Sequence, residues 1–174
     1  MKKRKIFTML ATTLLSSSFM SGVIFATDIN SAGSYETTVI DNNSDTGEFS
    51  LTIPSEVQMN EHFSVSLTKA ILPDNKTLSM RVNDGSDSGA FDSAVFPLYA
   101  ADGSQDGQFN VFKGTATLTN RDNIFTYYSD NPQPTASSPI TVDLQPKRDT
   151  SVAYTKDGQH SGPITFVVSF GTWY

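Results

Sequence analysis

The chain has 174 residues, 37% of them hydrophobic, and its 18 acidic and 12 basic residues give a formal net charge of −6. It contains no cysteine, which excludes disulfides, a thiol nucleophile and thiolate metal sites. The acidic balance argues against nucleic acid and anionic membrane surfaces as partners, because both carry phosphate charges that the chain would repel.

The N-terminus predicts a cleaved secretory signal. The basic head KKRK (2–5) precedes the mostly apolar run IFTMLATTLLSSSFMSGVIFA, an order that is typical of such signals. Because the run contains several threonine and serine residues, it has fewer apolar residues than the about 20 that a membrane span needs. We expect cleavage after Ala26, so that residues 1–26 are removed and residues 27–174 form one domain without an integral membrane anchor. That chain would be strongly acidic, because the signal removes four basic residues and no acidic ones.

After the signal, apolar residues alternate with polar ones, which is the pattern of a strand with one buried face. The clearest segments are EFSLTIP (48–54), HFSVSLTKAIL (62–72), TLSMRV (77–82), PITVDL (139–144) and GPITFVVSF (162–170). Weaker ones are YETTVI (35–40), AVFPLYA (94–100), FNVFKGTATLT (109–119) and NIFTYY (123–128). Pro97 indicates an edge strand or a bulge, and Gly114 is a position where its segment could divide.

These segments predict an all-β protein. About eight or nine short strands, separated by Gly, Pro, Asn and Asp, are typical of an antiparallel β-sandwich of immunoglobulin-like or Greek-key type. The long segment SDNPQPTASSP (129–139) could cross between two sheets. The segment PDNK (73–76) is typical of a tight hairpin turn, because proline presets the first turn dihedral.

The segment DNNSDTGE (41–48) places oxygen-bearing side chains at alternate positions, as at the start of a calcium loop. A helical calcium loop also needs glycine at its sixth position and an acidic residue at its twelfth. This chain has Thr46 and Thr52 there. Because strand patterns flank the segment on both sides, we interpret it as a hairpin turn.

Two later segments, NDGSDSGAFD (83–92) and ADGSQDGQ (101–108), are rich in aspartate. Loops from different strands can jointly supply the six to eight oxygens of a calcium site. Calcium is therefore the one cofactor that the sequence suggests, and the alternative is that these residues form ordinary solvated turns. The candidate metal-ligating residues are Asp84, Asp87, Asp92, Asp102 and Asp106.

The sequence contains no recognisable catalytic motif. His62 and His160 are the only histidines, and neither the G-x-S-x-G elbow nor a phosphate-binding glycine loop is present. His160 lies among turn residues in DGQHSGP (157–163), so we expect it at the surface. We predict that the protein is not an enzyme. An extracellular hydrolase with paired carboxylates is kept as a second alternative.

Aromatic residues supply candidates for ligand binding. Flat rings can stack on the apolar faces of sugars, which makes a carbohydrate-binding module the first alternative function. The same residues could instead pack within the core or at sheet edges. The candidate ligand-binding residues are Tyr99, Tyr127, Tyr128, Trp173 and Tyr174.

The signal, the absence of cysteine, LTIPSEV (51–57) and SGPITFVVSFGTWY (161–174) resemble small secreted surface proteins of Gram-positive bacteria. Those proteins have immunoglobulin-like or adhesin-like sandwich domains. The related cell-wall-binding WxL proteins carry a W-x-L motif, which this sequence does not contain. The resemblance implies a secreted, extracellular or surface-associated protein that acts by adhesion or as part of a cell-surface assembly. Its expected partner is a protein or a cell-wall or host glycan.

Overall fold

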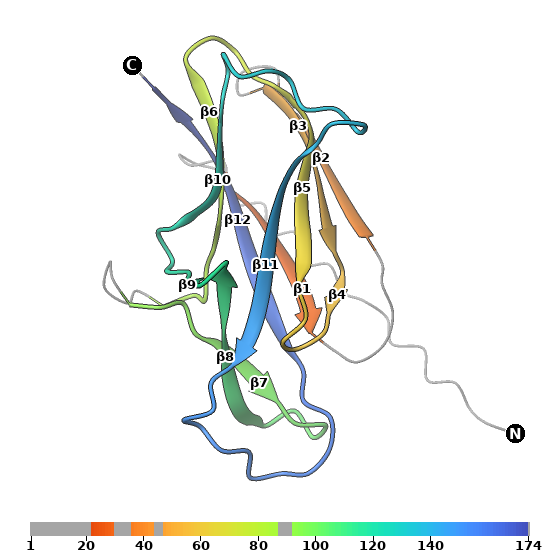
Figure 1. Cartoon of the computed structure of the whole chain (residues 1–174), viewed down its shortest axis with the longest axis vertical. Helices are drawn as coiled ribbons and strands as arrows, with labels where there is room; N and C mark the ends of the chain where they lie inside the picture. The colour runs from red at the N-terminus through yellow and green to blue at the C-terminus, as the bar shows by residue number, and fades with distance from the viewer. Residues whose placement is uncertain (1–21, 30–35, 44–46, 87–91, 174) are drawn as a thin grey trace, which may run out of the picture.

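A computed structural model describes residues 22–29, 36–43, 47–86 and 92–173 (Figure 1). Every regular element within these ranges is a β-strand, and no helix is present among them. Neighbouring strands pair antiparallel, with the exception of a short parallel contact between β1 and β4. The prediction of an all-β protein is therefore confirmed.

The strands are β1 (Gly22–Ile29), β2 (Glu36–Asn43), β3 (Gly47–Pro54), β4 (Glu56–Val57), β5 (Phe63–Ile71), β6 (Lys76–Val82), β7 (Phe96–Tyr99), β8 (Gln105–Lys113), β9 (Ala116–Thr117), β10 (Asn123–Tyr128), β11 (Ile140–Arg148) and β12 (Gly162–Thr172). This number exceeds the eight or nine expected. β4 and β9 have two residues each, too few for an alternation pattern, and β1 overlaps the expected signal. Gly114, with φ of +63°, separates β8 from β9, as its position suggested.

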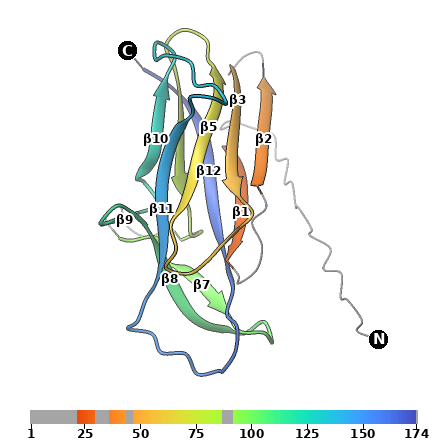
Figure 2. The same ribbon diagram turned by 45° about the vertical axis from the view of Figure 1, so that its right-hand side comes forward.

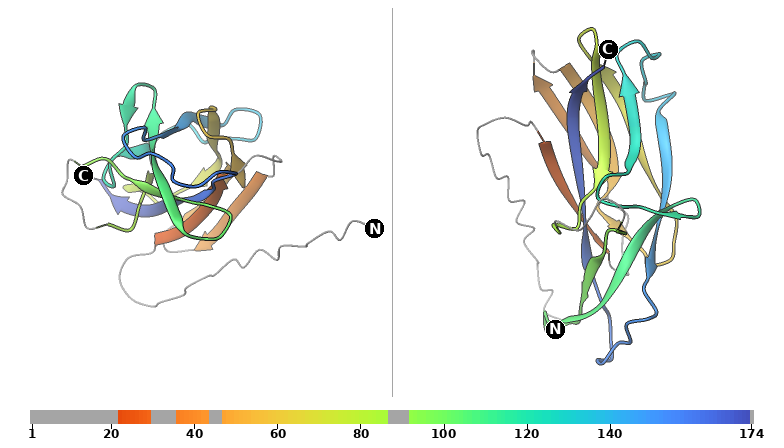
Figure 3. Two further views of the ribbon diagram at one scale, coloured as in Figure 1. Left: turned by 90° about the horizontal axis from the view of Figure 1, so that it is seen from below. Right: turned by 90° about the vertical axis from the view of Figure 1, so that its left-hand side faces the viewer.

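The strands form two sheets (Figure 2). The five-stranded sheet has the order β10-β6-β12-β1-β4, and the other has the order β2-β3-β5-β11-β8-β7, with β9 added beside β8. Both sheets curl, and together they form a half-barrel around the interior (Figure 3). β12 runs nearly the full length of the molecule and lies at the centre of the five-stranded sheet.

Two of the predicted connections are confirmed. β2 pairs antiparallel with β3 in a register that brings Asn43 opposite Gly47, so DNNSDTGE spans the connection between the two strands of a β-hairpin. Residues 129–139 lead from β10 in one sheet to β11 in the other. Pro97 also lies where expected, because β7 is an edge strand and its register shifts between Pro97 and Tyr99.

The predicted hairpin at 73–76 is wrong. The turn itself forms, since the Lys76 N–H donates to the Pro73 carbonyl at 3.2 Å and Asn75 has φ of +62°. However, the turn joins β5 and β6, which belong to different sheets. β5 already has β3 and β11 as neighbours, and β6 has β12 and β10. Neither strand therefore has an edge left with which to pair the other.

β1 crosses the expected signal cleavage site. In the full-length chain it pairs antiparallel with β12, from Gly22 opposite Ser169 to Ile29 opposite Gly162. Residues 22–26, which we expect to leave with the signal, are thus part of the five-stranded sheet before cleavage.

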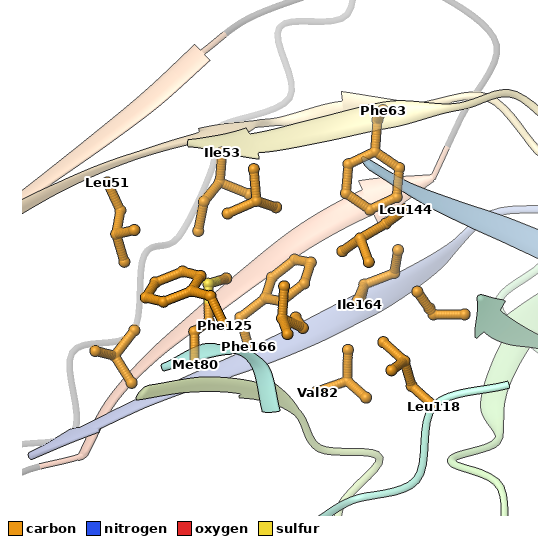
Figure 4. Packing of buried hydrophobic residues seen from close by; sticks show 14 of the residues in the cluster. Leu51, Ile53, Phe63, Met80, Val82, Leu118, Phe125, Leu144, Ile164 and Phe166 are labelled. Carbon is orange, nitrogen blue, oxygen red and sulfur yellow. The ribbon is translucent and has the colours of Figure 1, made fainter. Parts of the chain in front are cut away.

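The alternating apolar residues of both sheets meet in one core (Figure 4). Each of three strands contributes three side chains that are at most 1% exposed: Phe49, Leu51 and Ile53 from β3, Leu78, Met80 and Val82 from β6, and Ile164, Phe166 and Val168 from β12. Phe63 of β5 packs edge to face on Phe166 across the core, with ring centroids 6.4 Å apart. The two sheets therefore share a single hydrophobic interior.

Gly162 allows β7 to lie directly against the start of β12. A Cβ at this position would be 2.0 Å from the Pro97 carbonyl oxygen, and two hydrogen bonds between Tyr99 and Ser161 hold the strands at that distance. We expect Gly162→Ala to lower the free energy of unfolding by about 1–3 kcal/mol, because overpacking displaces backbone. Urea denaturation measures the effect.

The matched control is Gly171→Ala in the same strand. A Cβ there would meet only the Thr77 hydroxyl oxygen, at 2.6 Å, and a side-chain rotation can relieve that contact. Neither glycine has a positive φ, so the comparison isolates the steric effect. Equal effects at the two positions would refute the explanation.

Candidate functional site

The loop that joins β11 to β12, residues 149–161, is held by a buried aspartate. It lies at the lower end of the molecule in Figure 1. Asp106 of β8 accepts hydrogen bonds from the N–H and hydroxyl of Thr155, at 2.8 and 2.6 Å, and from the Lys156 N–H at 2.9 Å. The Nε2 atom of His160 lies 2.8 Å from the second carboxylate oxygen. Four contacts therefore attach one loop to one strand.

His160 is buried, and the expectation that it lies at the surface is wrong. Its side chain is 5% exposed and that of Asp106 is 3% exposed. The Nδ1 atom lies 3.1 Å from the Gly158 carbonyl oxygen, so both ring nitrogens face hydrogen-bond acceptors. Because neither nitrogen is left for a substrate, this geometry favours a structural role over that of a catalytic base.

Stacked side chains complete the attachment. The rings of Tyr154 and His160 are parallel, with centroids 3.8 Å apart. The Arg148 guanidinium lies 3.4 Å from the Tyr154 ring centroid, and at these distances it must occupy the other face of the ring. Gly107 makes room for the stack, because a Cβ there would be 2.5 Å from a Tyr154 ring carbon. We call Arg148, Tyr154, Thr155, His160 and Asp106 together the loop clamp.

Hydrogen bonding keeps the clamp aspartate ionised. The bond from the Thr155 hydroxyl, followed by the contact with His160, holds the pKa of Asp106 well below its ordinary value, although desolvation acts in the opposite direction. A carboxylate that accepts several hydrogen bonds loses them on protonation, which is why such bonds lower its pKa. Asp106 is thus a permanent acceptor at neutral pH.

Three other aspartates form local turns with a shared pattern. Each accepts hydrogen bonds from both the N–H and the hydroxyl of a serine two residues later. The pairs are Asp84 with Ser86, Asp102 with Ser104, and Asp149 with Ser151. These are Asx turns, in which the side chain replaces a backbone acceptor. The aspartate-rich segments therefore organise loops.

The structure does not bring the calcium candidates together. Asp84 and Asp92 precede β7 and Asp102 and Asp106 follow it, so a strand roughly 13 Å long separates the two pairs. Asp84 also accepts from Val95 and Asn120, and Asp102 forms an ion pair with Lys156 at 2.5 Å. Within the described ranges, no three His, Asp or Glu residues are grouped to hold an ion. Asp87 lies outside those ranges.

The aromatic candidates for ligand binding lie in different parts of the structure. Tyr127 is 1% exposed and donates its hydroxyl to the Asn131 carbonyl at 3.1 Å, so it is a core residue. Tyr99 is half-buried on β7, beside Ser161 at the lower end. Tyr128 and Trp173 pack edge to face at the upper end, with centroids 5.8 Å apart and an interplanar angle of 87°. Tyr174 lies outside the described residues.

Two exposed apolar side chains lie at the same upper end, Ile71 on the outer face of one sheet and Tyr128 on the outer face of the other. Tyr128 is 39% exposed and Ile71 is 44% exposed, and Val95 is the only other large hydrophobic residue exposed in the described residues from 47 onward. The backbone N–H of Trp173 donates to the Asn75 carbonyl at 3.0 Å, which places the C-terminal end of β12 beside the turn that follows Ile71. We call Ile71, Tyr128 and Trp173 the aromatic end.

Sequence reasoning missed Ile71 because of a bulge. Strict alternation from Phe63 places residue 71 on the buried face, but the register between β3 and β5 shifts beside Thr68. One extra residue in a strand moves the side chain of every later residue to the opposite face of the sheet. Ala70 is consequently 1% exposed and Ile71 is at the surface.

These features define an all-β protein of two curled sheets, with a clamped loop at one end and exposed aromatic and aliphatic side chains at the other. No protein-family model, curated protein or solved structure matches the chain. The resemblance to Gram-positive surface proteins therefore stays a prediction. No helix capable of crossing a membrane occurs in the part of the chain that the structure describes.

Proposed function

We propose that this protein is a secreted, surface-associated β-sandwich of immunoglobulin-like type that acts by binding. It would serve as an adhesin-like protein or as a structural component of a cell-surface assembly. The N-terminal signal pattern supports export. The single core shared by two sheets supports the sandwich, because each sheet buries its alternating apolar face against the other.

The aromatic end is the observation that carries this proposal. Ile71 and Tyr128 expose about two fifths of their surface each, whereas the residues that precede them, Ala70 and Tyr127, are buried in the core. Exposed aromatic and large aliphatic side chains that lie together mark interaction sites more often than scattered ones do. The backbone beneath is ordered by hydrogen bonds from Trp173 to Asn75 and from Ser129 to Lys76.

The ring geometry favours a protein partner over a glycan. Sugars bind best to flat platforms, where ring faces lie in one plane. Tyr128 and Trp173 are instead perpendicular, so at most one of them can lie flat against a sugar. A carbohydrate-binding module using a single ring is the remaining alternative, since that ring face would suffice for one sugar unit. Among the described residues, no observation favours the extracellular hydrolase.

We expect Tyr128→Ala and Trp173→Ala each to weaken binding to cell-wall or host-matrix fractions about tenfold or more, as removal of an interface anchor does. Pull-downs with the secreted protein, with and without a chelator, measure the loss. Val95→Ser is the matched control, because Val95 is also an exposed apolar residue, at 37%, but lies away from the aromatic end.

Trp173 is the only tryptophan, so its fluorescence reports directly on the aromatic end. A shift on addition of soluble wall oligosaccharides would favour the glycan alternative over the protein partner. Unchanged binding by both aromatic variants would exclude this end as the binding surface. Binding that disappears with chelator alone would instead support the calcium prediction.

A further inference from the structure

The edge of β12 is covered in the full-length chain by residues that we expect to be removed. Gly22–Ala26 pair with Thr165–Ser169, and only Thr27–Ile29 pair with the remaining residues 162–164. Cleavage after Ala26 would therefore leave three residues of β1 in place and uncover five residues of β12. This inference rests on the proposed function, because it requires export and that cleavage.

The uncovered backbone groups can be identified. The Thr165 carbonyl accepts from the Asn83 N–H at 2.9 Å, so the polar groups of Thr165 point toward β6. Because successive residues of an antiparallel strand bond to opposite neighbours, those of Phe166 and Val168 point toward β1. These two residues are 0% and 1% exposed. Cleavage would thus deprive two N–H and two C=O groups, which β1 covers in the full-length chain, of their partners.

A row of unpaired N–H and C=O groups at a sheet edge is a template for pairing with another strand. β4 pairs only with Asp28 and Ile29, which stay in place, so the opening lies along the edge of β12 opposite Gly22–Ala26. An extended segment of five residues matches the length of the uncovered edge, Thr165–Ser169. The segment that fills it in the full-length chain, VIFA, is apolar throughout.

We propose that signal removal opens a strand-acceptor site on β12, and that an extended apolar segment of a partner protein fills it in antiparallel orientation. The incoming strand would restore the hydrogen bonds of Phe166 and Val168 and complete the five-stranded sheet, as in other cases of strand addition. The leader segment protects this site until cleavage.

The test uses the secreted chain, with its N-terminus determined by mass spectrometry. The probe is the peptide KKGVIFA, which reproduces residues 22–26 behind two solubilising lysines. We expect an N-terminus at Thr27, saturable binding of the peptide, and an increase in the Tm of the protein with peptide concentration. The full-length chain made without export should not bind the peptide, because its own residues fill the site.

Two modified peptides test the predicted register. N-methylation of the residue equivalent to Phe25, which lies opposite Phe166, removes a donor to β12 and should weaken binding about tenfold or more. N-methylation at the position of Ile24, whose N–H points away from β12, should have a much smaller effect. Equal losses from the two modifications would overturn the predicted strand geometry.

Three outcomes would overturn the proposal. The first is an N-terminus upstream of Gly22, and the second is a chain that starts at Thr27 but does not bind the peptide. The third is self-association of that chain with exclusion of the peptide, because a second copy would then occupy the site. The proposed function fails separately. Tyr128→Ala and Trp173→Ala should leave peptide binding unchanged, and they report on the aromatic end alone.

Discussion

Phe166→Ala is expected to lower the free energy of unfolding by about 3–5 kcal/mol, the usual cost of removing a buried aromatic ring. The ring is fully buried and packs edge to face on Phe63 of the opposite sheet. Its loss removes apolar contacts on both sides of the core and leaves a cavity that two paired strands cannot close. Urea denaturation followed by circular dichroism measures the change.

Thr165→Ala is the control for this prediction. Thr165 is the neighbouring residue of β12, but it is only half-buried, and its backbone bond to Asn83 does not need the side chain. We expect a change of less than about 1 kcal/mol, as for most partly exposed positions. A similarly small loss for Phe166→Ala would show that the two sheets do not pack across this ring, and the sandwich proposal would fail with it.

Most of the fold could be predicted because alternation reports directly on burial. Residues such as Leu51, Met80 and Phe166 lie in period-two runs, and each of them is buried. Alternation does not indicate which strands are neighbours. The 73–76 turn shows this limit, since its residues specify a tight turn equally well within one sheet or between two. Two-residue strands such as β4 leave no pattern at all.

The candidate site was less accessible from sequence. The pairing of Asp106 with His160 joins residues 54 positions apart, and short motifs carry no information about such a distance. The aspartate-x-serine pattern, on which no expectation was based, marks the three Asx turns at Asp84, Asp102 and Asp149. Gly107 is the residue of the sequence that points most directly to the loop clamp, and the sequence analysis did not use it. Its φ of +150° and its contact with Tyr154 both require glycine.

Asp106→Asn is expected to release the 149–161 loop. The amide nitrogen would face the Lys156 N–H, so one donor would meet another, and a buried site tolerates this poorly. We expect trypsin to cut after Lys156 at least about tenfold faster, because local opening exposes the bond, and the Tm to fall by about 5 °C or more. Asp74→Asn makes the same charge change at an exposed position of the 73–76 turn and should alter neither.

The pH dependence distinguishes the loss of the clamp carboxylate from a general loss of structure. Asp106 has a folded-state pKa below the ordinary 3.8, so its contribution to stability is complete above about pH 4 and declines as the pH falls through the folded-state pKa. Exchange of the Thr155 and Lys156 amide hydrogens, corrected for intrinsic rates, should therefore remain slow from pH 7 to pH 5 and accelerate in stronger acid. Asp106→Asn should remove this acid-dependent component and leave fast exchange throughout. If wild-type protection were lost already at pH 5, the carboxylate would not be the group that holds the loop.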